Sequence, residues 1–309
     1  MRLSKGWALH IGILLLIIGA ALVMKIKLRE LNCGLEPSLE DNPRVLLLGD
    51  SHVGWNIDPA FIEHSINIGQ DSESINFSYY KLLRMLELYP SIKTVIYGLG
   101  YHQLYDFEGE AVYMLNRYDT ILDDAFYREK LEMEGSNFHF AMRRAVNKYN
   151  LPVGVSNDIA VYLIHGIIFK GERLPWMGMF KSYYENIIDR DYYFKKTHHI
   201  HYFEGSRPRQ ISELRVKMLK RIAETCQSRG IKLLLVNTPV HQSYYDKIPP
   251  GTISFVDSLA TSLEATGISY LNYSRMAVAD GLFYDYHHLN KQGSDIFSEI
   301  VAQASANGN

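Results

Sequence analysis

Residues 44–52 read RVLLLGDSH, and this stretch decides the fold class. Its first five residues, 44–48, form a largely apolar run of the kind found in a strand buried on both faces of a parallel sheet. A helix is expected to begin just after it, and Gly49 permits the tight turn in between. The Ser51 hydroxyl would then project from the carboxyl edge of the sheet, with its N–H near a helix N-terminus. Taken alone, the motif has a plain structural reading as well, because Asp50 and Ser51 are common turn and N-cap residue types.

The remaining strands and helices alternate along the chain. Short apolar runs predict strands, and amphipathic periods between them predict helices. Such alternation favours an α/β fold, a flavodoxin-like three-layer sandwich with a parallel sheet covered on both faces. In sheets of this kind the ligand lies beyond the carboxyl ends of the strands. The expected strands are 44–48, 65–68, 94–97, 231–236 and 268–271, and the expected helices are 79–88, 211–228 and 293–302.

The N-terminal residues 7–24 read WALHIGILLLIIGAALVM, with no acidic residue, lysine or arginine. A membrane-spanning helix needs about 17–25 such residues. A cleaved signal peptide is the alternative, because 19–21 (GAA) resembles a cleavage site. The apolar run continues past that site and a basic stretch follows, so residues 1–30 are expected to be an uncleaved, single-pass anchor. The flanking basic residues barely distinguish the two membrane orientations.

Beyond the anchor, three segments are expected. Residues 31–43 (LNCGLEPSLEDNP) are polar and interrupted by Gly and Pro, which predicts a linker. Residues 44–309 form the main domain. Within it, residues 101–208 are rich in aromatic, Met and His residues and show a weak strand pattern, which indicates a mostly helical insertion. The two cysteines, Cys33 and Cys226, are too few for a disulfide framework, and whether they pair is open.

Charge and composition narrow the class of partner. The 32 Lys and Arg residues nearly balance 34 Asp and Glu residues, for a net charge of −2. Nucleic-acid binding usually needs a basic face, so no nucleic-acid partner is expected. The chain contains 22 tyrosines. A Tyr-rich cleft suits sugars, although tyrosines also lie half-buried at ordinary surfaces.

A second motif, residues 285–290 (DYHHLN), precedes the last expected helix. A serine hydroxyl is a poor nucleophile at neutral pH and needs a base. His288 is suited to that role because imidazole titrates near neutrality. Asp285, three residues earlier, can reach back to hold Nδ1–H and leave Nε2 facing Ser51. The spacing Asp-x-x-His is weak evidence alone, and stronger when paired with a Gly-Asp-Ser after the first strand.

This pair of motifs resembles the SGNH (GDSL-type) hydrolase superfamily. Residues 283–293 (FYDYHHLNKQG) are similar to the D-x-x-H-L-N-x-x-G ending of its membrane-linked branch, which includes alginate and bacterial cellulose O-acetylation proteins and the teichoic acid D-alanyl-transfer protein. The resemblance covers about residues 44–302 in layout. It implies that Ser51 is the nucleophile, His288 the base and Asp285 the residue that orients it.

The resemblance also implies an oxyanion hole, from which this chain departs. Asn67-Ile68-Gly69 is similar to the start of the family's second block, whose next glycine falls on Ser72. The third block usually ends in an Asn, and here it reads GLGYH at 98–102. The expected hole therefore uses the N–H groups of Ser51 and Ser72. Tyr101 or His102 would have to replace the missing Asn, whose loss would otherwise cost about 10²–10³ in rate.

Other histidines give weaker signals. His241 follows the strand expected at 231–236 and either lines the cleft or is an ordinary loop residue. His198, His199 and His201 lie close in sequence, but no acidic residue lies within two positions of them. We therefore expect no metal and no cofactor.

Three functions fit the motifs. The first is acyl transfer, through an acyl-Ser51 intermediate, to a cell-envelope or extracellular polysaccharide. The second is an esterase or deacetylase acting on the same glycans. The third is a catalytically degenerate glycan-binding scaffold. From the resemblance, we expect the domain to lie outside the cytoplasm and to receive acyl groups from an integral-membrane partner of the membrane-bound O-acyltransferase type.

Overall fold

The computed structural model describes residues 5–34, 42–105, 118, 121–134, 176–183 and 190–306. The chain divides into two compact units. One comprises Met1–Ser38 and Ala111–Trp176, and the other comprises Leu39–Glu110 and Met177–Asn309. The second unit contains the sheet and the candidate site.

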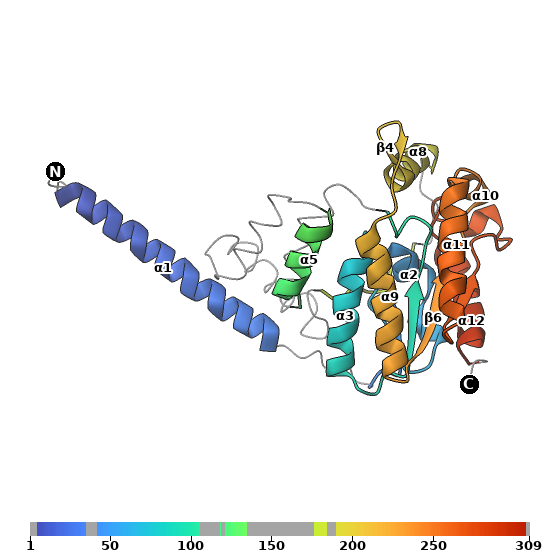
Figure 1. The fold of residues 1–309 in the computed structure, drawn as a ribbon, viewed down its shortest axis with the longest axis horizontal. Coiled ribbons are helices and arrows are strands. Elements are labelled where there is room, and N and C mark those ends of the chain that lie inside the picture. The colour runs from blue at the N-terminus through green and yellow to red at the C-terminus, as the bar shows by residue number, and fades with distance from the viewer. Residues whose placement is uncertain are drawn as a thin grey trace. The chain divides into compact units, whose positions relative to one another are not determined.

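Five parallel strands form the sheet of the second unit (Figure 1). They lie in the order β2-β1-β3-β6-β7, which is the flavodoxin-like order of a doubly wound sheet. The predicted α/β class and parallel sheet are confirmed, and each expected strand is present with small shifts at its ends. The strands are β1 (Val45–Leu48), β2 (Ser65–Asn67), β3 (Thr94–Gly98), β6 (Lys232–Asn237) and β7 (Ser269–Asn272).

Pairing in the sheet follows the apolar runs. On β1, Leu46 lies opposite Ile66 of β2 and Val95 of β3. On the other side of β3, Ile96 lies opposite Leu234 of β6. All five side chains are buried, because helices cover both faces of the sheet.

Helices α2 (Ser51–Asn56) and α12 (Lys291–Ala306) cover one face. Helices α3 (Ile75–Leu88), α9 (Glu213–Ser228) and α11 (Pro250–Glu264) cover the other, as right-handed crossovers require (Figure 1). The short elements η1 (Pro59–Phe61), α10 (Gln242–Tyr245) and η2 (Asp280–Leu282) lie in connecting segments. The core between the sheet and the α2/α12 layer consists of Leu47, Val53, Ile57, Ile62, Ile96, Leu234, Val236, Phe283, Leu289, Phe297 and Val301.

In the first unit, helix α1 (Lys5–Gly34) contains the apolar run expected to form an anchor. It extends four residues into the expected linker, which corrects the predicted boundary, since no Pro or strong helix-stop signal precedes Gly34. Among the described residues, no helix combines the length and apolar character that a membrane span requires. Cys226 is buried with a free thiol, and the side chain of Cys33 lies outside the described residues.

Much of the expected insertion, 101–208, also lies outside the described residues. Its described part includes two helices, α5 (Asp124–Glu134) and α8 (Arg190–Tyr202). A short antiparallel pair follows, made of β4 (Phe203–Glu204) and β5 (Arg207–Pro208). The prediction of a mostly helical insertion therefore stays a prediction over its undescribed part.

Candidate active site

Ser51 is placed by a turn that only a few side chains permit. β1 ends at Leu48, and Gly49 has φ of +145°, where an added Cβ would lie 3.3 Å from the backbone nitrogen of Gly98. Asp50 caps α2, because its Oδ1 accepts a 2.9 Å hydrogen bond from the N–H of His52. Ser51 is thus the first residue of α2 and remains partly exposed at the carboxyl end of β1.

The structure brings Ser51, His288 and Asp285 into one hydrogen-bonded relay. His288 Nε2 lies 2.8 Å from Ser51 Oγ, and His288 Nδ1 lies 2.8 Å from Asp285 Oδ2. Asp285 Oδ1 accepts the backbone N–H groups of His287 at 2.8 Å and His288 at 2.7 Å. With Nδ1–H donated to the carboxylate, Nε2 is free to accept the serine proton. The predicted convergence is found, while the roles of the three residues in catalysis stay predictions.

Asp285 is held in its ionised form. Burial by itself would raise the pKa of this carboxyl, but the imidazoles of His287 and His288 and the hydrogen bonds they donate prevail and hold the pKa well below its usual range. A carboxylate that stays ionised keeps its acceptor capacity for His288 Nδ1–H at every pH of interest.

Asn56 joins the two halves of the relay. At the end of α2, its Oδ1 accepts a 2.8 Å bond from the N–H of Leu289, next to His288. Its Nδ2 donates at 3.1 Å to Oγ1 of Thr238, which follows β6. Asn56 is fully buried, so these bonds connect the 283–290 loop to α2, and α2 to the end of β6. Sequence reasoning missed Asn56 and Thr238, and no local pattern marks either residue.

Five histidines gather around the relay; we call His52, His102, His201, His287 and His288 the histidine cluster. His52 Nε2 lies 3.2 Å from His287 Nδ1. His102 Nε2 lies 2.7 Å from Oδ2 of Asp50, and its ring stacks on that of His201 with centroids 4.3 Å apart. The cluster therefore continues from the reactive serine into the interior, with Asp50 and Asp285 as its two carboxylates.

Three members of the histidine cluster are neutral at pH 7. Burial lowers the pKa values of His52 and His201 well below the ordinary 6.5, and lowers that of His287 to about 3. Nearby Asp50 and Asp285 act in the opposite direction but do not overcome the loss of solvation. Burial removes the water that would solvate a charged imidazole, and for His52 and His287 this cost exceeds the attraction of the neighbouring carboxylates.

These shifts predict a steep loss of stability in acid. Below pH 6.5 the unfolded chain binds protons at His52, His201 and His287 that the folded chain does not, so stability falls as pH falls. Each histidine contributes about 1.4 kcal/mol per pH unit, or about 4 kcal/mol per unit for three. Denaturant unfolding followed by circular dichroism at pH 7, 6 and 5 measures this slope.

A matched pair of variants checks the source of that slope. His287→Gln removes one buried titrating group and should reduce the slope by about 1.4 kcal/mol per pH unit. His199→Gln removes an exposed histidine on α8 and should leave it unchanged. A free energy of unfolding that stays constant between pH 7 and pH 5 would contradict neutral burial of these imidazoles.

The predicted oxyanion residues Gly69 and Ser72 lie in the segment after β2. Gly69 N–H donates to Oδ1 of Asn67 at 2.8 Å, and an added Cβ there would lie 2.7 Å from the backbone nitrogen of Gly54. Ser72 is exposed and has φ of +58°, a left-handed backbone that favours glycine. Neither residue bonds to Ser51 among the described contacts, so their oxyanion role stays a prediction.

A buried ion pair between α3 and the segment after β2 holds the residues around Gly69 and Ser72 in place. Lys81 of α3 donates to Oε2 of Glu73 at 2.7 Å and to the carbonyl of Ile68 at 2.5 Å. The side chains of Lys81 and Glu73 have no exposed surface. Breaking such a pair leaves an uncompensated charge, so the ion pair specifies the position of this loop beside the sheet edge.

The other predicted site residues make different contacts. Tyr101 bonds through its hydroxyl to the carboxylate of Asp257, and His102 bonds to Asp50. Neither side chain bonds to Ser51 in the described structure, so a substitute for the family's Asn is not evident in either. His241 Nε2 lies 3.0 Å from Asp280, while its backbone N–H donates to the carbonyl of Tyr286 in the loop carrying the relay.

Three aromatic side chains extend from the relay residue His288; we call Trp55, Tyr183 and Tyr284 the aromatic cluster. The Trp55 ring stacks on His288 with centroids 4.3 Å apart and lies 4.6 Å from that of Tyr183. Tyr183 stacks in turn on Tyr284. Trp55 Nε1 donates to Asp71 at 2.7 Å, which fixes its plane. Tyr183 is 37% exposed, so the cluster offers an accessible flat apolar surface beside the reactive serine.

Among the comparisons with known proteins, only the one with solved structures found similar proteins. No protein-family model matches the sequence, and no curated protein matches it. A GDSL-like lipase from Bacteroides thetaiotaomicron is 13% identical with a TM-score of 0.41, over 92% of this chain and 98% of that one. A proposed acylhydrolase from Bacteroides fragilis is 13% identical with a TM-score of 0.39, over 91% and 95%. A proposed platelet activating factor from Streptococcus pneumonia is 10% identical with a TM-score of 0.41, over 96% and 98%. Likeness at this level does not identify the function of the present chain.

Proposed function

We propose that this chain is a serine-dependent acyl-transfer enzyme of the SGNH type, acting as an esterase or an acyltransferase. One observation carries the proposal: Ser51 Oγ, His288 and Asp285 form a continuous relay with both hydrogen bonds at 2.8 Å. The degenerate-scaffold alternative expects these side chains to diverge, so their convergence favours an enzyme. The order of the motifs along the chain and the parallel five-stranded sheet are those that the superfamily resemblance implies.

The chemistry follows from the relay. Ser51 Oγ attacks the carbonyl carbon of an acyl donor while His288 Nε2 takes its proton, and Asp285 stabilises the imidazolium that results. His288 then gives this proton to the leaving alcohol, and an acyl-Ser51 ester remains. A sugar hydroxyl or water next loses its proton to His288 Nε2 and attacks the carbonyl carbon of that ester, and His288 gives the proton to Ser51 Oγ as the bond between Oγ and the acyl carbon breaks. The backbone N–H of Ser51, at the start of α2, is the donor that the motif offers to the developing oxyanion.

A glycan acceptor is the finer part of the proposal, with hydrolysis of the same esters as the alternative. The aromatic cluster supports it, because sugar rings stack on flat aromatic surfaces whose edges carry hydroxyl groups. Tyr183 and Tyr284 present such a surface within a few ångströms of the Trp55 ring that stacks on His288. An acceptor bound there would place a hydroxyl near the base and displace water from the acyl-enzyme.

Membrane attachment through residues 7–24 completes the proposal. Large apolar side chains of α1 are exposed, among them Leu14, Leu15 and Leu16 at 56%, 64% and 73%. An anchor of this kind would hold the catalytic unit, outside the cytoplasm, beside an integral-membrane protein that supplies acyl groups. The supporting observation is the uninterrupted apolar run within a single helix.

Covalent trapping tests the proposal. We expect an activated acetyl ester to add one acyl group to the intact protein, and peptide mass spectrometry to place it on Ser51. The adduct should disappear in Ser51→Ala and persist in Ser262→Ala, whose hydroxyl bonds within its own helix to the Leu259 carbonyl. Equal labelling of Ser51→Ala and the parent would refute the assignment of the nucleophile.

A second arm of this experiment separates transfer from hydrolysis. With acetyl donor and oligosaccharide acceptor present, transfer yields acetylated sugar and hydrolysis yields acetate. If the aromatic cluster binds the acceptor, Tyr183→Ala should shift the product ratio toward acetate while acyl-enzyme formation stays near the parent rate. Tyr79→Ala, on α3, is the matched control and should leave the ratio unchanged. A product that is acetate alone in the parent would support the esterase alternative.

A further inference from the structure

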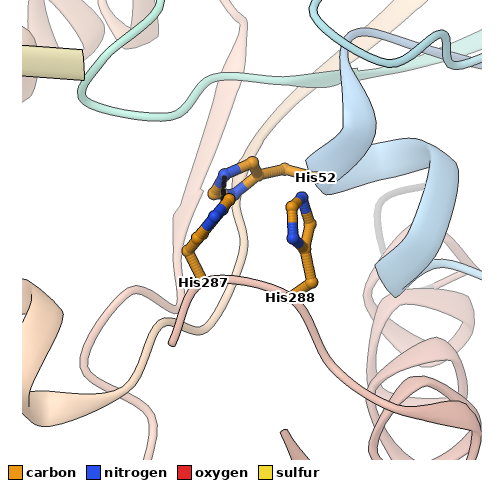
Figure 2. Close-up of side chains that lie close together, drawn as sticks. All are labelled: His52, His287 and His288. Atoms are coloured by element: carbon orange, nitrogen blue, oxygen red, sulfur yellow. Dashed lines mark hydrogen bonds between the residues drawn. The ribbon is translucent and has the colours of Figure 1, made fainter. Parts of the chain in front are cut away.

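We propose that His52, His287 and His288 form a binding site for a divalent transition-metal ion of the Zn²⁺ class, and that the bound ion switches off the chemistry of Ser51. Figure 2 shows the three imidazoles converging from two segments, the start of α2 and the loop before α12. The sequence predicted no metal, because the only histidines considered as ligands there were His198, His199 and His201. The proposed site uses other histidines, which come together only in the folded chain.

The spacing of the ring nitrogens fits one ion. One nitrogen from each of the three rings lies within 4.8 Å of the other two, and all three residues are buried. His52 Nε2 and His287 Nδ1 are 3.2 Å apart. Tetrahedral zinc with Zn–N distances of about 2.0–2.1 Å requires neighbouring nitrogens about 3.4 Å apart. A small rotation of either ring would therefore open the pair to a shared ion.

The opposite nitrogen of each ring faces an oxygen, which is the arrangement that orients metal-binding imidazoles. His52 Nδ1 lies 3.1 Å from Oγ1 of Thr238, and His288 Nδ1 lies 2.8 Å from Oδ2 of Asp285. His287 Nε2 lies 3.6 Å from the same carboxylate oxygen. One ring N–H of each imidazole can thus point outward to an oxygen, which leaves the other nitrogen of each ring directed inward.

Charge and proton balance also suit a divalent cation. Binding needs only a shift of tautomer in the His52–His287 pair, with Nδ1–H of His52 toward Thr238 and Nε2–H of His287 toward Asp285. No net proton is released, and no electron is transferred. The carboxylates of Asp285 and Asp50 lie next to the histidine cluster and offset the two positive charges of the ion.

The ion and the Ser51 proton would compete for the same lone pair, that of His288 Nε2. His288 Nδ1 is held by Asp285, so the ion takes Nε2, the atom that otherwise accepts the Ser51 proton. An imidazole coordinated through Nε2 cannot act as a base, and Ser51 loses its activation. The ion has three protein ligands, and its fourth position can be filled by water or by Ser51 Oγ.

Metal titration of the full chain tests the site. After treatment with EDTA and dialysis, Zn²⁺ measured by calorimetry and Co²⁺ measured by visible absorption should each bind with one equivalent per chain. His52→Gln and His287→Gln should weaken the affinity by at least about 10–100-fold. His199→Gln, which removes an exposed histidine of α8, should match the parent. X-ray absorption of the zinc-loaded parent should show imidazole nitrogens at about 2.0 Å, a readout that needs no variant to fold.

Ser51→Ala separates this proposal from the proposed function. It keeps all three histidine ligands, with water available for the fourth position, and should still bind one equivalent of Zn²⁺, whether or not the parent has esterase activity. If the parent is active, zinc should inhibit ester turnover, and the zinc concentration that halves the rate should equal the concentration that half-saturates the site. EDTA should then restore the turnover. Absence of a one-equivalent site, or unchanged affinity in both glutamine variants, would overturn the metal site. Full activity with the site saturated would overturn the switch.

Discussion

Ser51→Ala is expected to lower the turnover of an activated ester by about 10⁵–10⁶-fold, close to the uncatalysed rate. The substitution removes the only atom in the relay that attacks the carbonyl carbon, while the loops that hold Asp285 and His288 keep their backbone bonds. Initial rates with p-nitrophenyl acetate, corrected for the reaction in buffer, measure the loss. Thermal unfolding of the variant should remain within a few degrees of the parent, because Ser51 is partly exposed and contributes little to the core.

A double variant gives this prediction its sharper form. Residues that act as one unit show strongly non-additive losses, so Ser51→Ala combined with His288→Ala should be no slower than Ser51→Ala alone. Ser262→Ala on α11 controls for loss of a serine hydroxyl away from the sheet edge. If the rate loss of the double variant equals the product of the losses in the two single variants, His288 acts on some nucleophile other than Ser51.

Asp285→Asn should lower turnover by about 10⁴-fold, through the tautomer of His288. Asp285 Oδ1 accepts two backbone N–H groups, so the amide oxygen of Asn would take that place. The amide NH₂ would then face His288 Nδ1 and require a lone pair there. The ring proton would move to Nε2, toward Ser51, and a protonated Nε2 cannot accept the serine proton.

Nitrogen-15 NMR of labelled protein tests this explanation independently of activity. The parent should show His288 protonated on Nδ1, and Asp285→Asn should show it protonated on Nε2. Asp280→Asn, which changes a surface carboxylate beside His241, should alter turnover less than about 2-fold. A rate loss with the parent tautomer unchanged would point to a loss of charge stabilisation instead of a loss of orientation.

Local patterns in the sequence were enough to locate the sheet and the relay. The run 44–48 predicted a buried strand, found as β1, and Gly49 predicted the tight turn that follows it, where its φ is +145°. The Asp285–His288 spacing allowed one carboxylate to hold the nearby imidazole. These inferences concern residues within a few positions of one another, where backbone geometry restricts the possible contacts.

The remaining site residues could not be found in this way. Trp55 and Asn56 lie on α2 and Thr238 follows β6, and each acquires its role only when α2, β6 and the 283–290 loop meet. Tyr101 illustrates the reverse case, since it sits in the block where a site residue was expected but bonds to Asp257. Whether a polar side chain faces the serine or a neighbouring helix depends on packing that no local pattern records.

The sequence by itself predicted the α/β class and the doubly wound sheet, because short-range periodicity and turn chemistry are properties of neighbouring residues, and its two motifs together with the resemblance singled out Ser51, His288 and Asp285. Only the tertiary structure decided that His52 and His287, 235 positions apart, would stand 3.2 Å from one another beside that relay. Their proximity depends on the sheet order, which sets β1 between β2 and β3, and on the packing of the 283–290 loop against α2. Contacts between distant segments are fixed by the packing of the whole core, so the histidine cluster, and the metal site proposed for it, emerge at that level alone.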